Sequence, residues 1–198
     1  MPPLMAALPV NEIFHITPFS RVKVGACCLL LSTIVLGVAL PVAVGQSVTT
    51  TLPSSTGPDA VAVNPVTNQI YVPNLNGNNV TVINGSNNST TMLSAGKSPI
   101  GAAANPVTNK IYVVNTNSNN VTVIDGATEA TSTVTVGTAP FAVALNPVTD
   151  QIYVVNESSN NVTVIDGPTN STSTVTVGTK PIALAVNTVT NKIFAAIA

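Results

Sequence analysis

The sequence predicts an all-β fold built from repeated four-stranded sheets. The first observation is a strict period of 41 residues, which three kinds of landmark keep without an insertion. These landmarks are Pro58, Pro99, Pro140 and Pro181; Asn64, Asn105, Asn146 and Asn187; and Tyr71, Tyr112, Tyr153 and Phe194. The second observation is that each complete repeat holds four short runs rich in Val, Ile, Thr and Tyr, without helical periodicity. Four strands in a repeat of this length are typical of a β-propeller blade.

Residues 1–45 are interpreted as a signal peptide or an N-terminal membrane anchor. Two basic residues stand just before residues 24–40, which carry no charge and are expected to form a hydrophobic helix. Small residues near the end of the segment favour cleavage after Gly45 and export of the rest of the chain. The competing interpretation is an uncleaved anchor over residues 24–44, because 17 residues of helix rise about 25 Å, close to a bilayer core of about 30 Å.

Residues 46–198 carry the repeats, which follow an expected outer strand near residues 49–52. The blades are expected at about residues 58–98, 99–139 and 140–180, with a partial blade at 181–198.

The second blade shows the expected strands most clearly. They are “IGAAAN”, “KIYVVN”, “NVTVID” and “TSTVTV”, which suit strands in length and in their content of β-branched residues. The connection “NPVTN” places Pro in a turn and Asn where a left-handed backbone is tolerated. Runs such as “VTVI” are apolar or small on both faces of the strand, so each sheet needs a neighbour to cover it.

The repeats resemble the YVTN-repeat β-propeller family over about residues 47–198. The motifs are “IYVPN” at 70–74, “IYVVN” at 111–115 and 152–156, the following “NNVTVI”, and G-x-x-P joints at Gly96, Gly137 and Gly178. The resemblance implies an exported or cell-surface propeller, as in archaeal surface-layer-type and bacterial periplasmic proteins, and implies little about activity. Pro73, Asn84 in place of Asp, and the final “IFAAIA” depart from the pattern.

The number of repeats predicts an incomplete or open ring. The sequence holds three complete blades and two strands of a fourth, whereas closed propellers have about 4 to 8 blades. We weigh three possibilities: a fragment of a longer product, an open arc, or a protomer that associates with another copy to complete a propeller. The final strand, “KIFAAIA”, is expected to present an unpaired edge.

The composition argues against enzymatic chemistry. Only 7% of the residues are charged and the net charge is −1, so there is no basic field for nucleic acid, and no nucleic-acid partner is expected. After Gln46 there is no His, Cys, Arg or Trp, which excludes His-based triads, His-ligated metals and Arg phosphate clamps there. We therefore expect no catalytic residue, no metal and no cofactor, and a membrane contact only through the N-terminal segment.

The polar residues with possible chemistry have plainer structural interpretations. Asp125 and Asp166 end a strand before Gly and are expected to serve turns. The loops at 74–79 and 115–120 copy the spacing of a calcium loop but contain no carboxylate, which favours a polar turn.

The sequons that begin at Asn79, Asn120 and Asn161 are possible glycan acceptors. The same sequence pattern also arises wherever an Asn turn precedes a strand of β-branched residues. Lys97 and Lys180 lie in the joints between blades, at a rim where propellers bind ligands, and are the candidate binding residues; solvated surface lysines are the plainer interpretation.

Two functions fit the sequence. The first is a non-catalytic exported propeller that acts as a binding scaffold for a protein or a surface polymer. The second is part of a propeller enzyme or cofactor protein, similar to quinoproteins or lactonases, whose active residues lie in other blades. The absence of His and Arg from the repeats favours the scaffold.

Overall fold

The computed structural model describes residues 12–15 and 47–198. The chain divides into two units, Met1–Pro53 and Ser54–Ala198. The predicted hydrophobic helix at 24–40 and the cleavage site after Gly45 lie outside the described residues. Within the described ranges, no helix has the length and apolar character needed to cross a bilayer.

In the first unit, strand β1 (Glu12–His15) pairs in parallel with strand β2 (Ser47–Thr51). The expected strand near 49–52 is therefore present. It was expected to be the outer strand of a blade, but it pairs with β1 and not with the third strand of a four-stranded sheet. A fourth blade strand needs the free edge of a third strand, and the described residues before β2 hold only β1.

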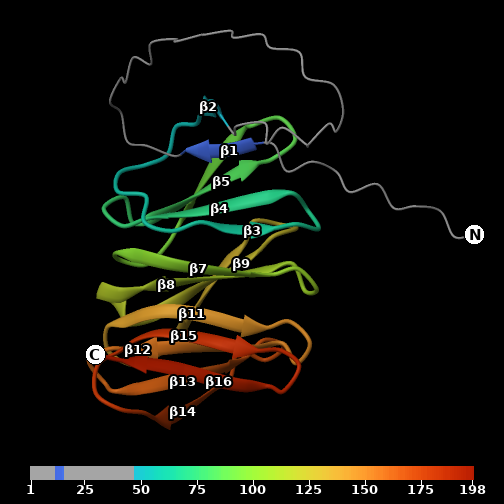
Figure 1. The fold of residues 1–198 in the computed structure, drawn as a ribbon. Coiled ribbons are helices and arrows are strands. Elements are labelled where there is room, and N and C mark those ends of the chain that lie inside the picture. Colours follow the sequence, from blue (N-terminus) through green and yellow to red (C-terminus); the bar gives the residue numbers. More distant parts are fainter. Residues whose placement is uncertain (1–11, 16–46) are drawn as a thin grey trace, which may run out of the picture. The chain divides into compact units, whose positions relative to one another are not determined.

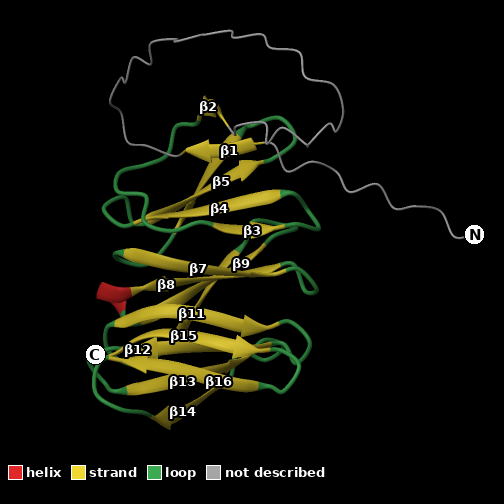
Figure 2. Ribbon diagram, viewed as in Figure 1, coloured by secondary structure: helices red, strands yellow, loops and turns green. Residues whose placement is uncertain are grey.

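The second unit consists of four antiparallel sheets, which we number in chain order (Figures 1 and 2). Sheet 1 contains β3 (Ala62–Asn64), β4 (Gln69–Asn74), β5 (Asn79–Asn84) and β6 (Thr90–Ser94). Sheet 2 contains β7 (Pro99–Asn105), β8 (Lys110–Asn115), β9 (Asn120–Asp125) and β10 (Thr131–Thr135). Sheet 3 contains β11 (Pro140–Asn146), β12 (Gln151–Asn156), β13 (Asn161–Asp166) and β14 (Thr172–Thr176). Sheet 4 contains β15 (Pro181–Asn187) and β16 (Lys192–Ile197).

The predicted all-β class, with three four-stranded sheets and two strands of a fourth, is confirmed. The connection between β8 and β9 contains a 3₁₀ turn, η1 (Thr116–Ser118) (Figure 2). The first strands of successive sheets lie side by side, β3 by β7, β7 by β11 and β11 by β15 (Figure 1). This is the arrangement of propeller blades, in which the first strands line the axis and the fourth strands lie outermost.

Sheet 1 begins differently from the sheets that follow. Its first strand starts at Ala62, and Pro58 forms only an isolated bridge with Asn74. In sheet 2 the corresponding strand runs the whole way from Pro99, with Gly101 paired to Val114. Pro73 occupies the place of Val114 in sheet 1, and because proline has no N–H, this part of the ladder lacks a donor.

From β2 onward, every connection between strands contains a residue with left-handed backbone. In the three “NPVT” turns these residues are Asn68 (φ 53°), Asn109 (φ 53°) and Asp150 (φ 50°), and in the equivalent “NTVT” turn of sheet 4 the residue is Asn191 (φ 52°). The predicted role of Asn in these turns is therefore confirmed, since Asn and Asp adopt this conformation at a lower cost than other side chains. In the joints between sheets the left-handed residues are Ser98, Ala139 and Lys180.

The core lies between the sheets. On β8, Ile111 and Val113 pack with residues of sheet 1, whereas Tyr112 and Val114 pack with residues of sheet 3. All of these side chains are fully buried. Alternate residues of one strand thus face opposite neighbours, so the apolar character of both faces predicted from the sequence reflects burial on both sides.

Candidate binding site on the joint rim

One rim of the sheets is held together by the asparagine that opens each “NPVT” turn. Asn64 donates its side-chain amide to Asn109 in the next sheet at 2.7 Å, Asn105 donates to Asp150 at 2.6 Å, and Asn146 donates to Asn191 at 2.8 Å. All three donors are fully buried. The most constant motif of the sequence therefore links sheets to one another and offers no free reactive group.

The opposite rim contains the second turn of sheets 1, 2 and 3 and the joint that leads from each of them to the next sheet. We call it the joint rim. The main chain of Lys97 is held there, since its N–H donates to the Ser118 hydroxyl and its carbonyl accepts from Asn117 at 3.2 Å. The N–H of Lys180 donates to the Asn160 side chain at 2.8 Å. Both backbones are fixed by the repeat, which leaves the lysine side chains as the variable part.

The structure does not bring the two predicted lysines together. Lys97 lies between β6 and β7, whereas Lys180 lies between β14 and β15, two joints further along the chain. They also occupy different repeat positions, since Thr138 corresponds to Lys97 and Ala139 to Lys180. One shared site for both lysines is therefore not formed by this part of the chain.

Lys180 instead shares a surface depression with an acidic residue that the sequence analysis did not select. The depression has a volume of about 360 Å³ and is lined by Glu157, Ser158, Asn160, Thr179 and Lys180. In the preceding blade the positions of Glu157 and Lys180 hold Thr116 and Ala139. The signal that would have found Glu157 is this departure from the repeat, because a residue that the architecture does not require stands out against the period.

The turn interpretation agrees with the geometry of Asp125 and Asp166. The Asp125 carboxylate accepts from the N–H groups of Ala127 at 2.9 Å and Thr128 at 3.0 Å, and Asp166 accepts from the N–H of Thr169 at 3.2 Å. The backbone hydrogen bonds from Thr128 and Ala127 lower the pKa of Asp125, and Lys110 adds to this effect. Each carboxylate closes its own turn.

The side-chain amide donors of the asparagine-rich loops likewise bond within their own sheet, whereas the buried Oδ1 atoms of Asn74 and Asn115 have no hydrogen-bond partner. The Asn115 amide donates to Asn120 at 2.8 Å and to Thr122 at 2.9 Å, and the same pattern joins Asn74 to Asn79 and Thr81. Among the described residues, no group of three His, Cys, Asp or Glu side chains is placed to hold a metal ion. In the sequons at Asn79, Asn120 and Asn161 the threonines are buried. Glycosylation at these sites stays a prediction.

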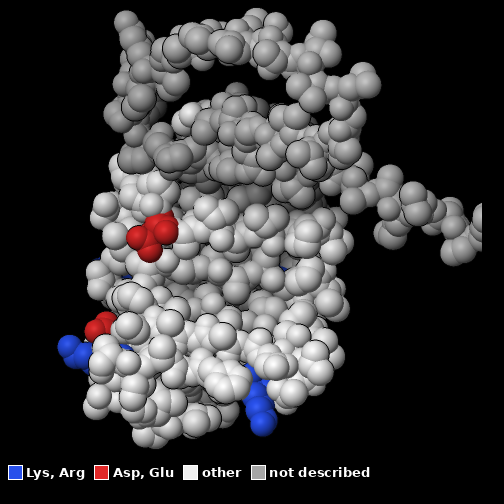
Figure 3. Space-filling view, viewed as in Figure 1, with Lys and Arg blue, Asp and Glu red and all other residues white. Residues whose placement is uncertain are grey.

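On the face shown in Figure 3, the described residues carry few charged side chains and are mostly uncharged. A charged pair such as Glu157 and Lys180 is therefore a distinctive feature of its surroundings. Lys110 is not available in the same way, because its ammonium group donates to the Gly167 carbonyl of the next sheet at 2.8 Å.

Comparison with known proteins supports the fold. The sequence matches no protein-family model, and no curated protein matches it. Among solved structures, hydrazine synthase from Kuenenia stuttgartiensis is similar, with a TM-score of 0.68, 20% identity, and coverage of 74% of this chain and 43% of that one. A functionally unknown protein from Desulfotomaculum acetoxidans has a TM-score of 0.63 and 16% identity, with coverage of 73% and 50%.

The chain spans half or less of the length of both proteins. At these identities the likeness shows a shared arrangement of propeller-like repeated sheets and nothing of activity.

Proposed function

We propose that this chain is a non-catalytic, exported β-propeller repeat protein that acts as a binding scaffold through its joint rim. The observation that carries the proposal is a difference between two groups of polar residues. The repeated Asn and Asp side chains make hydrogen bonds within turns or between sheets, as Asn105 and Asp150 do. Glu157 and Lys180 depart from the repeat and share one depression.

The chemistry of the depression favours a polar partner that offers both donors and acceptors. Glu157 supplies an acceptor, Lys180 a donor, and Ser158, Asn160 and Thr179 supply neutral polar groups. A protein loop or a hydroxyl-rich surface polymer has this combination of groups, whereas nucleic acid would meet no basic field.

Export and family membership form part of the same proposal. The charged flank and apolar stretch that end near Gly45 support export, by a cleaved signal or an anchor. The “IYVVN” and “NNVTVI” motifs support membership of the YVTN-repeat family. The second candidate remains a propeller enzyme or cofactor protein whose reacting groups are supplied by other blades.

The test combines location and binding. Cells that express the full chain are fractionated, and the purified protein is titrated against envelope protein and envelope polysaccharide prepared separately. We expect the chain outside the cytoplasm, and binding to one of the two preparations that weakens at least fivefold in the double variant Glu157→Gln with Lys180→Asn. Asparagine keeps the left-handed backbone of position 180 accessible.

Glu129→Asn is the matched control, because Glu129 also has a left-handed backbone (φ 60°) but lies in the turn between β9 and β10 on the other rim. Binding that the control weakens as much as the double variant, or a chain retained in the cytoplasm, would refute the proposal.

A further inference from the structure

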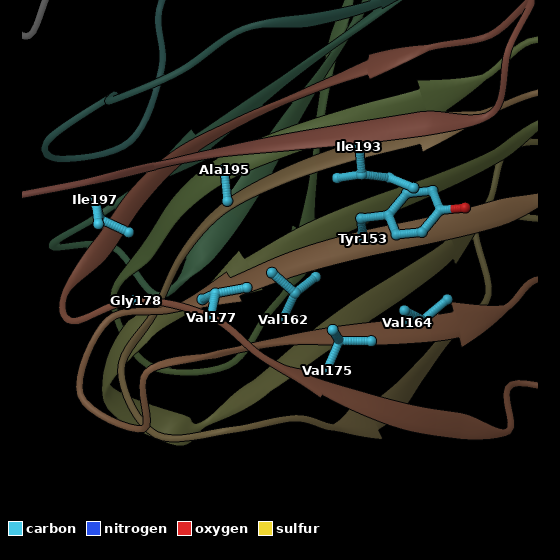
Figure 4. A pocket seen from close by; sticks show the side chains of 9 residues that line it. All are labelled: Tyr153, Val162, Val164, Val175, Val177, Gly178, Ile193, Ala195 and Ile197. Carbon is cyan, nitrogen blue, oxygen red and sulfur yellow. The ribbon is translucent and has the colours of Figure 1, made fainter.

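The space between neighbouring sheets is lined by apolar side chains. Between sheets 3 and 4, Val162, Val164 and Val175 project from sheet 3, and Ile193 lies against the ring of Tyr153 (Figure 4). The exposed asparagines of the described chain lie instead in turns or at the ends of strands. A covalent modification of an asparagine side chain therefore depends on the chemistry of the turns.

Three overlapping sequons occur in one of these turns. The connection from β5 to β6 reads “NGSNNST” over residues 84–90, so that Asn-x-Ser or Asn-x-Thr begins at Asn84, at Asn87 and at Asn88. The corresponding turns of sheets 2 and 3 read “DGATEAT” and “DGPTNST”. Among these three turns, only the first has an asparagine at the position of Asn87. This pattern is the acceptor sequence of N-linked glycans, which are carried on the surface.

The turn itself does not need an amide at position 87. The N–H of Ser89 donates to the side-chain oxygen of Asn87 at 2.9 Å. In sheets 2 and 3 the corresponding N–H donates to the hydroxyl of Thr128 at 3.3 Å and to that of Thr169 at 3.2 Å. Threonine thus supplies the oxygen that closes the turn, whereas Asn87 adds an amide nitrogen, which forms no hydrogen bond to the described residues.

The exposure of Asn87 is a property of the turn. Asn87 and Ser89 are both exposed. Thr128 and Thr169 are exposed as well, although each belongs to a sheet that has another sheet before it in the stack. The accessibility of this position therefore does not depend on what precedes sheet 1.

Position 88 is different, because its counterparts face the preceding sheet. The carboxylate of Glu129 accepts from the hydroxyl of Thr91 in sheet 1 at 3.4 Å. Asn170 shares a depression of about 190 Å³ with residues of sheet 2, such as Ser132, and its amide oxygen is buried. Of the two neighbouring asparagines, the turn itself keeps Asn87 accessible.

The other sequons are engaged in the fold. The hydroxyls of Thr81, Thr122 and Thr163, which complete the three repeated sequons, are buried and accept from asparagine side chains at 2.9–3.0 Å. In the sequon that begins at Asn84, the hydroxyl of Ser86 accepts from the Asn68 side chain at 3.2 Å. An accessible asparagine and an accessible hydroxyl two residues later come together at Asn87 and Ser89.

We propose that Asn87 accepts an N-linked glycan. Its amide nitrogen attacks the first carbon of a sugar that is carried on a lipid pyrophosphate. The nitrogen–carbon bond forms, the carbon–oxygen bond to the phosphate breaks, and its electron pair leaves with the lipid pyrophosphate, while the nitrogen loses one proton. The Ser89 hydroxyl completes the sequon that the transferring enzyme recognises. The inference rests on the proposed function in one respect, since export brings the chain to such a donor.

A glycan at this place is compatible with binding at the joint rim. The first and third turns of an antiparallel sheet lie on one rim and the second turn lies on the other. The glycan on Asn87 therefore leaves the depression of Glu157 and Lys180 open. It also adds hydrated groups to a chain in which only 7% of the residues are charged.

The test incubates the purified, folded full chain with a single-subunit oligosaccharyltransferase that accepts Asn-x-Ser/Thr. The probe is an oligosaccharide linked to a lipid pyrophosphate, and mass spectrometry of proteolytic fragments locates the glycan. We expect one glycan per chain, on Asn87. Because the donor is supplied in the reaction, the result does not depend on where a cell places the chain, and it is independent of the test of the proposed function.

Two variants copy the other sheets and should keep the fold. Asn87→Thr retains an oxygen for the Ser89 N–H, as in sheets 2 and 3, and Ser89→Ala reproduces the residue of sheet 2. Both are expected to abolish the modification. Asn88→Gly is the matched control, because it removes the neighbouring sequon, tolerates the left-handed backbone (φ 61°) and leaves the sequon of Asn87 intact. It should keep the glycan.

A synthetic peptide that copies residues 82–92 is modified in parallel to show that the sequence is an acceptor when it is unfolded. A folded chain that stays unmodified while the peptide reacts, or a peptide that does not react, overturns the proposal. So does a glycan located on Asn79, Asn120 or Asn161, or its loss in the Asn88→Gly variant.

Discussion

The side-chain amide of Asn105 in sheet 2 donates a hydrogen bond of 2.6 Å to the carboxylate of Asp150 in sheet 3. The oxygen of the same amide accepts from the N–H of Val107 at 3.0 Å, so one fully buried side chain closes its own turn and holds the next sheet. Because the partners are 45 residues apart, this bond also fixes how successive sheets meet.

Replacing Asn105 by alanine is expected to lower the free energy of unfolding by about 1–3 kcal/mol, because a buried bond to a carboxylate is lost. Chemical denaturation of the full chain measures this change. Asn187→Ala is the control: Asn187 closes the same kind of turn through the N–H of Val189, but it is exposed and makes no bond to a further sheet in the described chain. Its expected cost is below about 1 kcal/mol, and equal losses in the two variants would count against the role in linking sheets.

Tyr112 and Tyr71 are expected to respond in opposite ways to loss of their hydroxyl groups. The Tyr71 hydroxyl donates to Gln69 at 2.6 Å, whereas the buried Tyr112 hydroxyl has no hydrogen-bond partner because Lys110, which has no acceptor, replaces the glutamine. Tyr71→Phe should cost about 1 kcal/mol of unfolding free energy, and Tyr112→Phe should be neutral or stabilising. The midpoints of chemical denaturation of the two variants test this prediction. A Tyr112→Phe variant that is less stable than the Tyr71→Phe variant would contradict it.

Alkaline pH is expected to destabilise the fold through its tyrosines. Burial raises the pKa of Tyr71 to about 12, and burial also raises the pKa values of Tyr112 and Tyr153. An unfolded tyrosine has a pKa of about 10, so above that pH the unfolded chain releases protons that the folded chain keeps. The stabilisation is fully present below about pH 10 and is lost as the pH rises through about 12.

Phenolate absorbance and denaturation midpoints, followed together across this range, provide the measurement. We expect tyrosine ionisation to accompany unfolding, and Tyr71→Phe to reduce the slope. Ionisation of all three tyrosines near pH 10 with the fold intact would be the opposite result.

The joint between sheets 2 and 3 contains a removable strain. Ala139 has φ 51°, a left-handed conformation that Asn holds in most turns of the described chain and that Gly57 holds at the corresponding repeat position ahead of sheet 1. Ala139→Gly is expected to raise the unfolding free energy by about 1 kcal/mol. Ala144→Gly in strand β11 is the control and should lower it by about 0.5–1 kcal/mol. Thermal unfolding of the two variants checks the signs, and destabilisation by both would show that position 139 is not strained.

The 41-residue period allowed the sheets to be predicted from the sequence. The side-chain contacts that join one repeat to the next could not be predicted from it. “KIYVVN” showed that both faces of β8 are apolar, and burial of Ile111 and Tyr112 against opposite neighbours follows from that. The bond from Asn105 to Asp150 was hidden, because “NPVT” reads as a complete local turn. Glu157 was missed for a related reason: its proximity to Lys180 depends on where the second turn of a sheet meets the next joint.

The pairing of β2 with β1 could not be predicted from the sequence either. The threonine-rich residues 49–52 fit the fourth strand of a blade in composition, but a strand's composition does not name its partner. The interruption of the ladder at Pro73 could have been predicted, since proline lacks an N–H to donate.

The central claim is that an inner sheet such as sheet 2 is stable only because its two neighbours cover both of its apolar faces. The most direct measurement is the circular dichroism and denaturant response of residues 99–139 alone, compared with the full chain. We predict a disordered spectrum and no cooperative transition for the isolated sheet, because Ile111, Val113, Tyr112 and Val114 would all face water. A strand-rich spectrum with a cooperative transition from that single repeat would contradict the account.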